Sequence, residues 1–96
     1  MKHYKIKITG RVQGIGLRFS AMQIAYRFEV KGFVQNLKDG SVYIEAEGEE
    51  ENIDRFLQWC RTGPLGARIA NTDFTEGEVK NFKSFDIVRS GSGNNP

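Results

Sequence analysis

Apolar and polar residues alternate at the start of the chain. Tyr4, Ile6 and Ile8 alternate with two lysines and a threonine, and a period of two predicts a half-buried β-strand over residues 3–9. Residues 30–37 predict a second strand. A third is predicted from residue 42, where apolar and polar positions alternate again: Val42, Ile44 and Ala46 against Tyr43, Glu45 and Glu47. Asp39-Gly40 indicates a tight hairpin turn between these two strands, because this pair tolerates positive φ.

Two segments with a helical period separate the strands. The first, from Arg18 to Phe28, has one apolar face: Ala21, Met22, Ile24, Ala25 and Phe28. The second has apolar residues at i, i+3, i+4 and i+7: Ile53, Phe56, Leu57 and Cys60. Glu49, Glu50 and Glu51 fall in its first turn and Arg61 in its last, which matches the helix dipole. Gly63-Pro64 ends this helix.

The last third of the chain predicts two further strands, over residues 71–76 and 82–89, with Phe85 and Ile87 on the buried face of the second. The order is therefore βαββαβ with a split or extra final strand. It predicts an α+β sandwich of the ferredoxin-like kind, with two helices on one face of a mostly antiparallel sheet of four to five strands. A single domain is expected over residues 1–90, followed by a disordered tail over 91–96. This architecture hosts many functions and does not decide among them.

Composition narrows the functional classes. The chain has 96 residues, 39% hydrophobic and 27% charged, which is ordinary for one small globular domain. No apolar run approaches the ~18 residues of a membrane span, and no signal-peptide block follows the basic start. The single cysteine, Cys60, cannot form an internal disulfide, which fits a reducing compartment. A cytoplasmic location is therefore expected, with no membrane partner.

Charge and rare residues exclude several chemistries. His3 is the only histidine, and nothing in the sequence places a nucleophile beside it, so we interpret it as a satisfied or solvent-facing side chain. Two-thiol metal sites are excluded by the single cysteine. A net charge of +2 argues against broad nucleic-acid binding but leaves room for a small anion at one local site.

The stretch from Gly10 to Arg18 favours such a site. Its three glycines allow the backbone to curl so that successive N–H groups point inward, and the helix that follows adds unpaired N–H groups. Arg18 lies where its guanidinium could grip an anion through two hydrogen bonds. The competing interpretation is a glycine-rich turn with a solvated arginine, because the stretch is neither a Walker A motif nor a full Gly-x-Gly-x-x-Gly fingerprint.

Asn36 is the second candidate. Asparagine is a poor strand former, and its amide both donates and accepts, so it could orient a water molecule. Alternatively it bonds the Asp39-Gly40 turn, and spacing alone favours that alternative.

These two stretches resemble the signature of the acylphosphatases. Residues 10–18 (GRVQGIGLR) resemble the phosphate loop of that family, and residues 32–36 (GFVQN) with 39–42 (DGSV) resemble its second motif. Residues 63–69 (GPLGARI) are similar to the loop after its second helix, and residues 84–87 (SFDI) resemble its final strand. The resemblance covers roughly residues 3–89 in the same order.

The resemblance implies hydrolysis of carboxyl-phosphate mixed anhydrides without metal or cofactor and without a covalent intermediate. It implies that Arg18 binds the phosphoryl group and that Asn36 positions the attacking water. The backbone N–H groups of the loop would assist Arg18: Gln13, Gly14, Ile15, Gly16 and Leu17. The expected partner is a small acyl phosphate, with inorganic phosphate or sulfate competing, and nothing requires more than a monomer. The chemistry is plausible because phosphoryl transfer depends mainly on positioning and charge stabilisation.

Two residues depart from the family pattern. Leu17 stands where the family usually has an aromatic residue, which affects loop packing or substrate preference. Glu29 stands where the family usually has a glycine, and a left-handed backbone there would cost roughly 1 kcal/mol.

Two other functions remain open. An RNA-binding module of the same architecture is one, since Lys31-Gly32-Phe33 begins like an aromatic RNA-recognition motif, but Val34-Gln35-Asn36 breaks that pattern. The other is a catalytically silent relative that binds phosphate or a protein partner, against which the joint presence of Arg18 and Asn36 argues.

Overall fold

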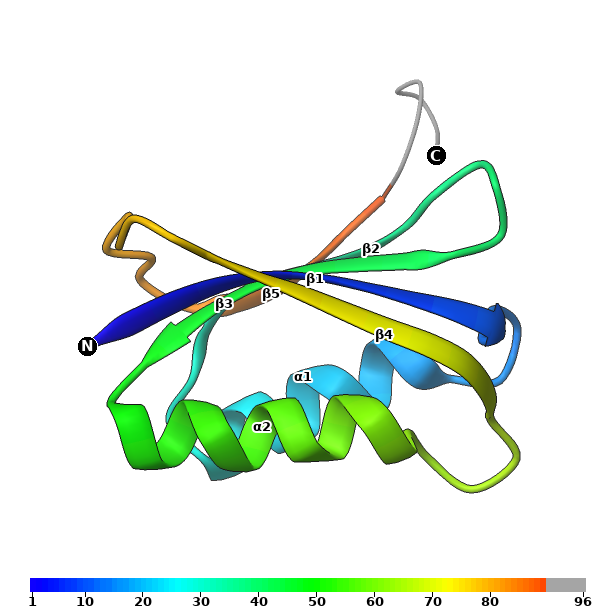
Figure 1. Ribbon diagram of the computed structural model, residues 1–96, viewed down its shortest axis with the longest axis horizontal. Helices are drawn as coiled ribbons and strands as arrows, with labels where there is room; N and C mark the ends of the chain where they lie inside the picture. Colours follow the sequence, from blue (N-terminus) through cyan, green and yellow to red (C-terminus); the bar gives the residue numbers. More distant parts are fainter. Residues whose placement is uncertain (90–96) are drawn as a thin grey trace.

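The computed structural model describes residues 1–89, so the tail predicted over residues 91–96 lies outside the described part. Within it, two helices pack on one face of a five-stranded sheet (Figure 1), which confirms the ferredoxin-like α+β fold. In chain order the elements are β1 (Lys2–Arg11), α1 (Leu17–Arg27), β2 (Lys31–Asn36), β3 (Val42–Gly48), α2 (Glu50–Thr62), β4 (Arg68–Gly77) and β5 (Phe85–Val88). No helix in this range is long and apolar enough to span a bilayer.

The strands lie in the order β4-β1-β3-β2-β5 and are antiparallel except for the parallel pair β2–β5. The register aligns apolar positions across the sheet, because Ile6 lies opposite both Ile44 and Phe74, and Val34 lies opposite Ile44 and Ile87. These residues form the side of the sheet that the helices cover. Parallel pairing also brings the end of β5 beside the end of β2, where Asn36 is located.

The core follows the predicted apolar faces. On α2 the four predicted residues are all buried, and burial raises the pKa of the Cys60 thiol. On α1 the buried positions are Leu17, Ala21 and Ala25, while the larger predicted residues of this face pack against the core only in part. Glu49 precedes the first residue of α2 as its N-cap, so only Glu50 and Glu51 lie in the first turn.

The last two strands differ from their predicted bounds. The strand predicted over 71–76 runs from Arg68 to Gly77 because it pairs along almost the whole of β1. The strand predicted over 82–89 is shorter, since the backbone N–H of Phe82 donates to the Glu47 carboxylate at 2.7 Å instead of joining a ladder. Residues 78–84, which we call the cover segment, therefore cross the sheet rather than extend it.

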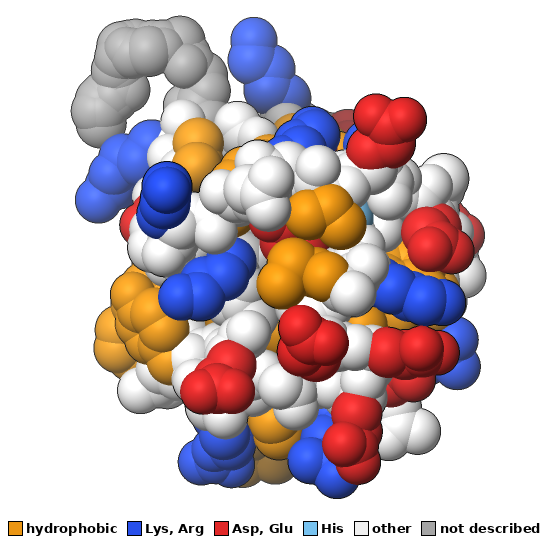
Figure 2. All heavy atoms as spheres, turned by 90° about the vertical axis from the view of Figure 1, so that its left-hand side faces the viewer, with side chains coloured by type: hydrophobic (Ala, Val, Ile, Leu, Met, Phe, Trp, Pro, Cys, Tyr) orange, Lys and Arg blue, Asp and Glu red, His pale blue; other side chains and the backbone are white. Residues whose placement is uncertain are grey.

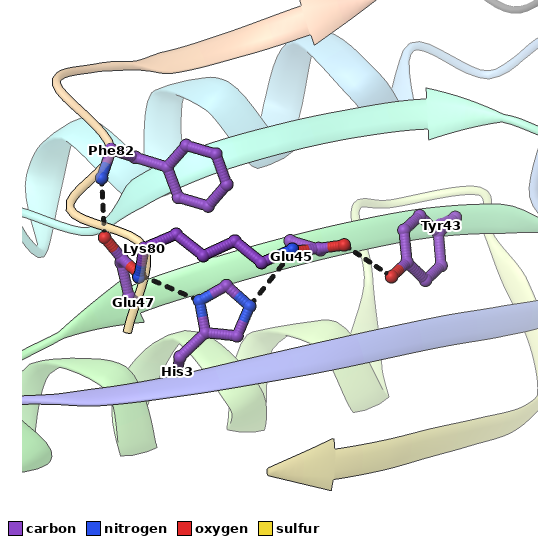
Figure 3. A network of polar contacts seen from close by, with 6 residues as sticks. All are labelled: His3, Tyr43, Glu45, Glu47, Lys80 and Phe82. Atoms are coloured by element: carbon purple, nitrogen blue, oxygen red, sulfur yellow. Dashed lines mark hydrogen bonds and ion pairs between the residues drawn. The ribbon is translucent and has the colours of Figure 1, made fainter. Parts of the chain in front are cut away.

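β3 is buried on both faces, although its alternation is typical of a strand with one solvated side. Glu45 and Glu47 are only 7% and 1% exposed, on the face away from the helices. His3 from β1 is fully buried between them, with Nδ1 2.8 Å from Glu47 and Nε2 3.0 Å from Glu45 (Figure 3). The histidine is thus satisfied, as predicted, but by two buried carboxylates.

The cover segment completes this network. The backbone N–H of Lys80 donates to Glu47 at 2.8 Å, and its ammonium donates to Glu45 at 2.9 Å. The Phe82 ring stacks on His3 with centroids 5.9 Å apart. Burial opposes ionisation of Glu47, yet the N–H groups of Lys80 and Phe82 and the His3 ring outweigh it and lower its pKa.

On the end of the molecule shown in Figure 2, acidic and basic side chains are mixed rather than separated by sign.

Candidate active site

The loop between β1 and α1 takes a conformation that glycine favours. Gly14 and Gly16 have φ of 78° and 76°, in the left-handed region, and a Cβ at either would meet no atom within 4 Å. The glycines are therefore needed for backbone conformation rather than for space. Gly16 is the N-cap of α1, with no side-chain cap and no acidic residue in the first turn of the helix. This arrangement leaves N–H groups at the start of α1 without an intrahelical acceptor.

A cavity of about 220 Å³ opens at this loop. It is lined by the loop, the start of α1, the end of β2 and the end of β5: Val12, Gln13, Gly14, Gly16, Leu17, Arg18, Phe19, Asn36, Ile87 and Arg89. The structure thus brings Arg18 and Asn36, far apart in sequence, to one cavity. Of the predicted loop residues, only Ile15 is not part of the lining, because it packs against the core.

The charge of the lining is positive. Arg18 and Arg89 contribute two guanidinium groups, and none of the lining residues in the described part of the chain is acidic. Among the described residues, no carboxylate forms an ion pair with Arg18. A guanidinium without a carboxylate partner beside unpaired N–H groups is suited to bind an anion.

Asn36 does not close the hairpin turn. That turn is held by Asp39, whose Oδ1 accepts hydrogen bonds from the hydroxyl and the backbone N–H of Ser41, and by the N–H of Gly40, which donates to Leu37. The Asn36 Oδ1 atom is buried and has no hydrogen-bond partner among the described residues. A buried polar atom of this kind ordinarily has a partner, and one that lines a cavity can find it in a water or a ligand.

Asp39 also fixes the tip of the hairpin to β1. The Ser41 hydroxyl, the Ser41 N–H and the Lys7 ammonium, 3.1 Å away, together lower the pKa of Asp39 to about 2. Its carboxylate is therefore ionised at neutral pH, and the turn is stabilised on both sides.

Sequence reasoning missed several residues at this cavity. For Gln13, the sequence predicts a contribution from the backbone N–H alone. In the structure its side chain also takes part, because Nε2 donates to the Leu37 and Ser41 carbonyls, each at 2.9 Å. Phe19 and Ile87 form apolar wall, and Arg89 adds a cation. Ile87 and Arg89 reach the cavity through the parallel β2–β5 pair, a non-local pairing for which the sequence carries no local signal.

The two departures have clear structural outcomes. Leu17 is 2% exposed and belongs to the core, so an aliphatic side chain fills this position below the loop. Glu29 has φ of 56°, so the left-handed conformation that a glycine would favour is adopted by a residue with a Cβ. Fold and cavity together define a small α+β sandwich with a positively charged, carboxylate-free cavity at a glycine-rich loop.

Comparison with known proteins identifies the family. The sequence profile of the family described as Acylphosphatase matches residues 4–87. The acylphosphatase of Archaeoglobus fulgidus is 39% identical over 84 residues, which cover 88% of this chain and 94% of the relative. That of Listeria welshimeri is 44% identical over 85 residues, which cover 86% and 91%. This chain belongs to the acylphosphatase family of enzymes.

Solved structures agree with this assignment. The crystal structure of acylphosphatase from Bacillus subtilis matches with a TM-score of 0.89 at 32% identity, covering 92% of this chain and 99% of that one. Full-length HypF, in its phosphate- and nucleotide-bound form, matches with a TM-score of 0.85 at 36% identity. That match covers 94% of this chain but 12% of HypF, so a similar unit is also part of a longer protein.

Proposed function

We propose that this chain hydrolyses the carboxyl-phosphate bond of acyl phosphates to a carboxylate and inorganic phosphate at the cavity beside Arg18. The observation that supports this most directly is that Arg18 and Asn36 line one cavity, where the buried Asn36 Oδ1 has no hydrogen-bond partner within residues 1–89. A carboxylate-free lining does not repel a phosphate dianion.

In the proposed complex, Arg18 and the N–H groups of residues 13–17 bind the phosphoryl oxygens. These donors stabilise the negative charge on the oxygens during transfer, the role that a metal ion has in many other phosphoryl-transfer enzymes. Because the donors are fixed by the loop and the helix, they need little reorganisation as the reaction proceeds.

Asn36 accepts a hydrogen bond from the water and orients it toward phosphorus, opposite the acyl oxygen. As the water oxygen bonds to phosphorus, the bond from phosphorus to the acyl oxygen breaks and a carboxylate leaves, while one proton of the water passes to a phosphoryl oxygen to give dihydrogen phosphate. A carboxylate is a weak base, so its departure requires no general acid. The contribution of Asn36 is therefore orientation of the nucleophile. The proposed working form is a cytoplasmic monomer.

The test is the hydrolysis of benzoyl phosphate in metal-free buffer with EDTA. Asn36→Ala should lower kcat about 10²–10³-fold while inorganic phosphate still inhibits competitively. Arg18→Ala should weaken phosphate inhibition by about 10–100-fold as well as slow turnover, because it removes hydrogen bonds to a charged group. Asn71→Ala, on the exposed face of β4, is the matched control. It should leave both kcat and the phosphate inhibition constant unchanged.

The first of two results would overturn the proposed hydrolysis, and the second would overturn only the role of Asn36. A folded wild type that binds phosphate without turnover would be a catalytically silent relative. Turnover that survives Asn36→Ala would remove Asn36 from the mechanism while leaving the reaction itself in place.

A further inference from the structure

The Gln13 side chain joins two parts of the cavity that the sheet does not connect directly. Its single NH₂ group has two hydrogens, and both are used: one hydrogen bond goes to the Leu37 carbonyl and one to the Ser41 carbonyl, each at 2.9 Å. These carbonyls lie at the two ends of the β2–β3 turn, which is itself closed by the Leu37 N–H donating to the Ser41 carbonyl at 2.9 Å. Gln13 therefore holds this turn at both ends.

The geometry of the sheet makes this link important. The loop follows β1, whereas Asn36 ends β2, and β3 lies between these strands. Ladder hydrogen bonds consequently relate Asn36 to the loop only through an intervening strand. Leu37 directly follows Asn36, so a bond from Gln13 to its carbonyl acts one residue from the side chain that lines the cavity.

We propose that Gln13 is a positioning residue that sets the place of Asn36 relative to the phosphate loop. The inference rests on the proposed hydrolysis. In-line attack requires the water and the phosphorus to be aligned, and a displacement of about 1 Å costs about 10²-fold in rate. Gln13 does not act on the reacting atoms through its side chain. It couples the part that holds the phosphate to the part that holds the water.

This role separates turnover from binding. Gln13→Met keeps the length of the side chain and removes both donors, so kcat should fall about 10–100-fold. The backbone N–H groups and Arg18 are unchanged, so competitive inhibition by inorganic phosphate should stay within about threefold. Gln35→Met is the matched control, because Gln35 precedes Asn36 on the opposite face of β2 and does not line the cavity. Its kcat should equal that of the wild type.

A double-mutant cycle with Asn36→Ala tests the mechanism of the effect. If Gln13 acts through Asn36, adding Gln13→Met to Asn36→Ala should lower kcat less than twofold further. The proposal would be overturned if the double mutant lost kcat by the product of the two single-mutant factors. It would also be overturned if the phosphate inhibition constant of Gln13→Met rose in parallel with its loss of kcat. Should Gln13→Met fail to fold, Gln13→Leu, which also lacks both donors and adds no charge to the cavity, enters the same cycle.

A second readout does not depend on turnover. In the wild type, NMR of the Asn36 side-chain amide should respond to added inorganic phosphate, and in Gln13→Met this response should change while phosphate affinity stays constant. An unchanged response would overturn the positioning role even if the chain proved inactive. Inactivity of the wild type with a changed response would instead refute the hydrolase proposal and leave the coupling intact.

Discussion

Replacement of Glu47 by glutamine should destabilise the fold far more than its small change in size suggests. The Glu47 carboxylate accepts three hydrogen bonds, from the His3 ring, the Lys80 N–H and the Phe82 N–H, at 2.8, 2.8 and 2.7 Å. In Glu47→Gln an NH₂ group replaces one of the two oxygens and meets a donor. The substitution also leaves the buried His3 ring with one fewer negative charge.

The expected loss follows from these contacts. Removing one partner of a buried ion pair costs about 3–5 kcal/mol, which is a large part of the ~5–15 kcal/mol that stabilises a domain. At roughly 4–8 °C per kcal/mol for a chain of this size, Tm should fall by about 12–40 °C. Glu78→Gln makes the same change of charge at an exposed position of the cover segment and should alter stability by less than about 0.5 kcal/mol.

The effect of Glu47 on the free energy of unfolding should depend on pH. The pKa of Glu47 is lower in the folded protein than its ordinary value of 4.5, so its stabilisation is fully present above that value. It is lost as pH falls through the lower folded pKa. Urea unfolding followed by circular dichroism should therefore show a wild-type advantage over Glu47→Gln at pH 7 that shrinks below about pH 4. A loss under 1 kcal/mol at pH 7, or a difference that persists unchanged at pH 3, would refute the reasoning.

Three further outcomes can be measured on stability and reactivity. Glu29→Gly should raise stability by about 1 kcal/mol in urea unfolding because it relieves the left-handed backbone, whereas Glu29→Gln, which keeps the Cβ, should not. Gly32→Ala should prevent folding, since its Cβ would overlap the carbonyl oxygen of Glu45. Gly40→Ala has open space around it and should cost only about 1 kcal/mol of stability, so circular dichroism should show a folded protein for Gly40→Ala alone. Cys60 should react with Ellman's reagent only as fast as the chain unfolds, because its thiol is fully buried and the reagent cannot reach it in the native fold; rapid labelling of the native protein would contradict this.

Local patterns predicted the elements because each depends on neighbours in sequence. The alternation at Ile6 and Ile8 predicts one buried face of β1, and the apolar spacing on α2 predicts one buried face of that helix. The structure confirms both faces. The loop glycines likewise carry their conformational requirement within the loop. The fold was therefore accessible from these patterns. The roles of Arg18 and Asn36 are implied by the family resemblance instead, since spacing alone favours a turn contact for Asn36.

Non-local contacts were not accessible in this way. Nothing near Glu45 or Glu47 indicates that the cover segment, from the other end of the chain, will bury them against His3. The Gln13 bonds to the β2–β3 turn depend on where two separate loops meet, which no periodicity encodes. The same limit applies to Arg89, whose place in the lining depends on the parallel pairing of β5.

The position of β1 inside the sheet has a consequence for how the chain folds. β1 pairs with β3 on one side and with β4 on the other, and His3 lies opposite Gly77. Such distant pairings slow folding, since long loops must close before they are rewarded by contacts. Until β4 docks, one edge of β1 is open to another chain. Lys5 and Lys7 place charges along this transient edge, which disfavours association of two unfinished sheets while the last strands are still being added.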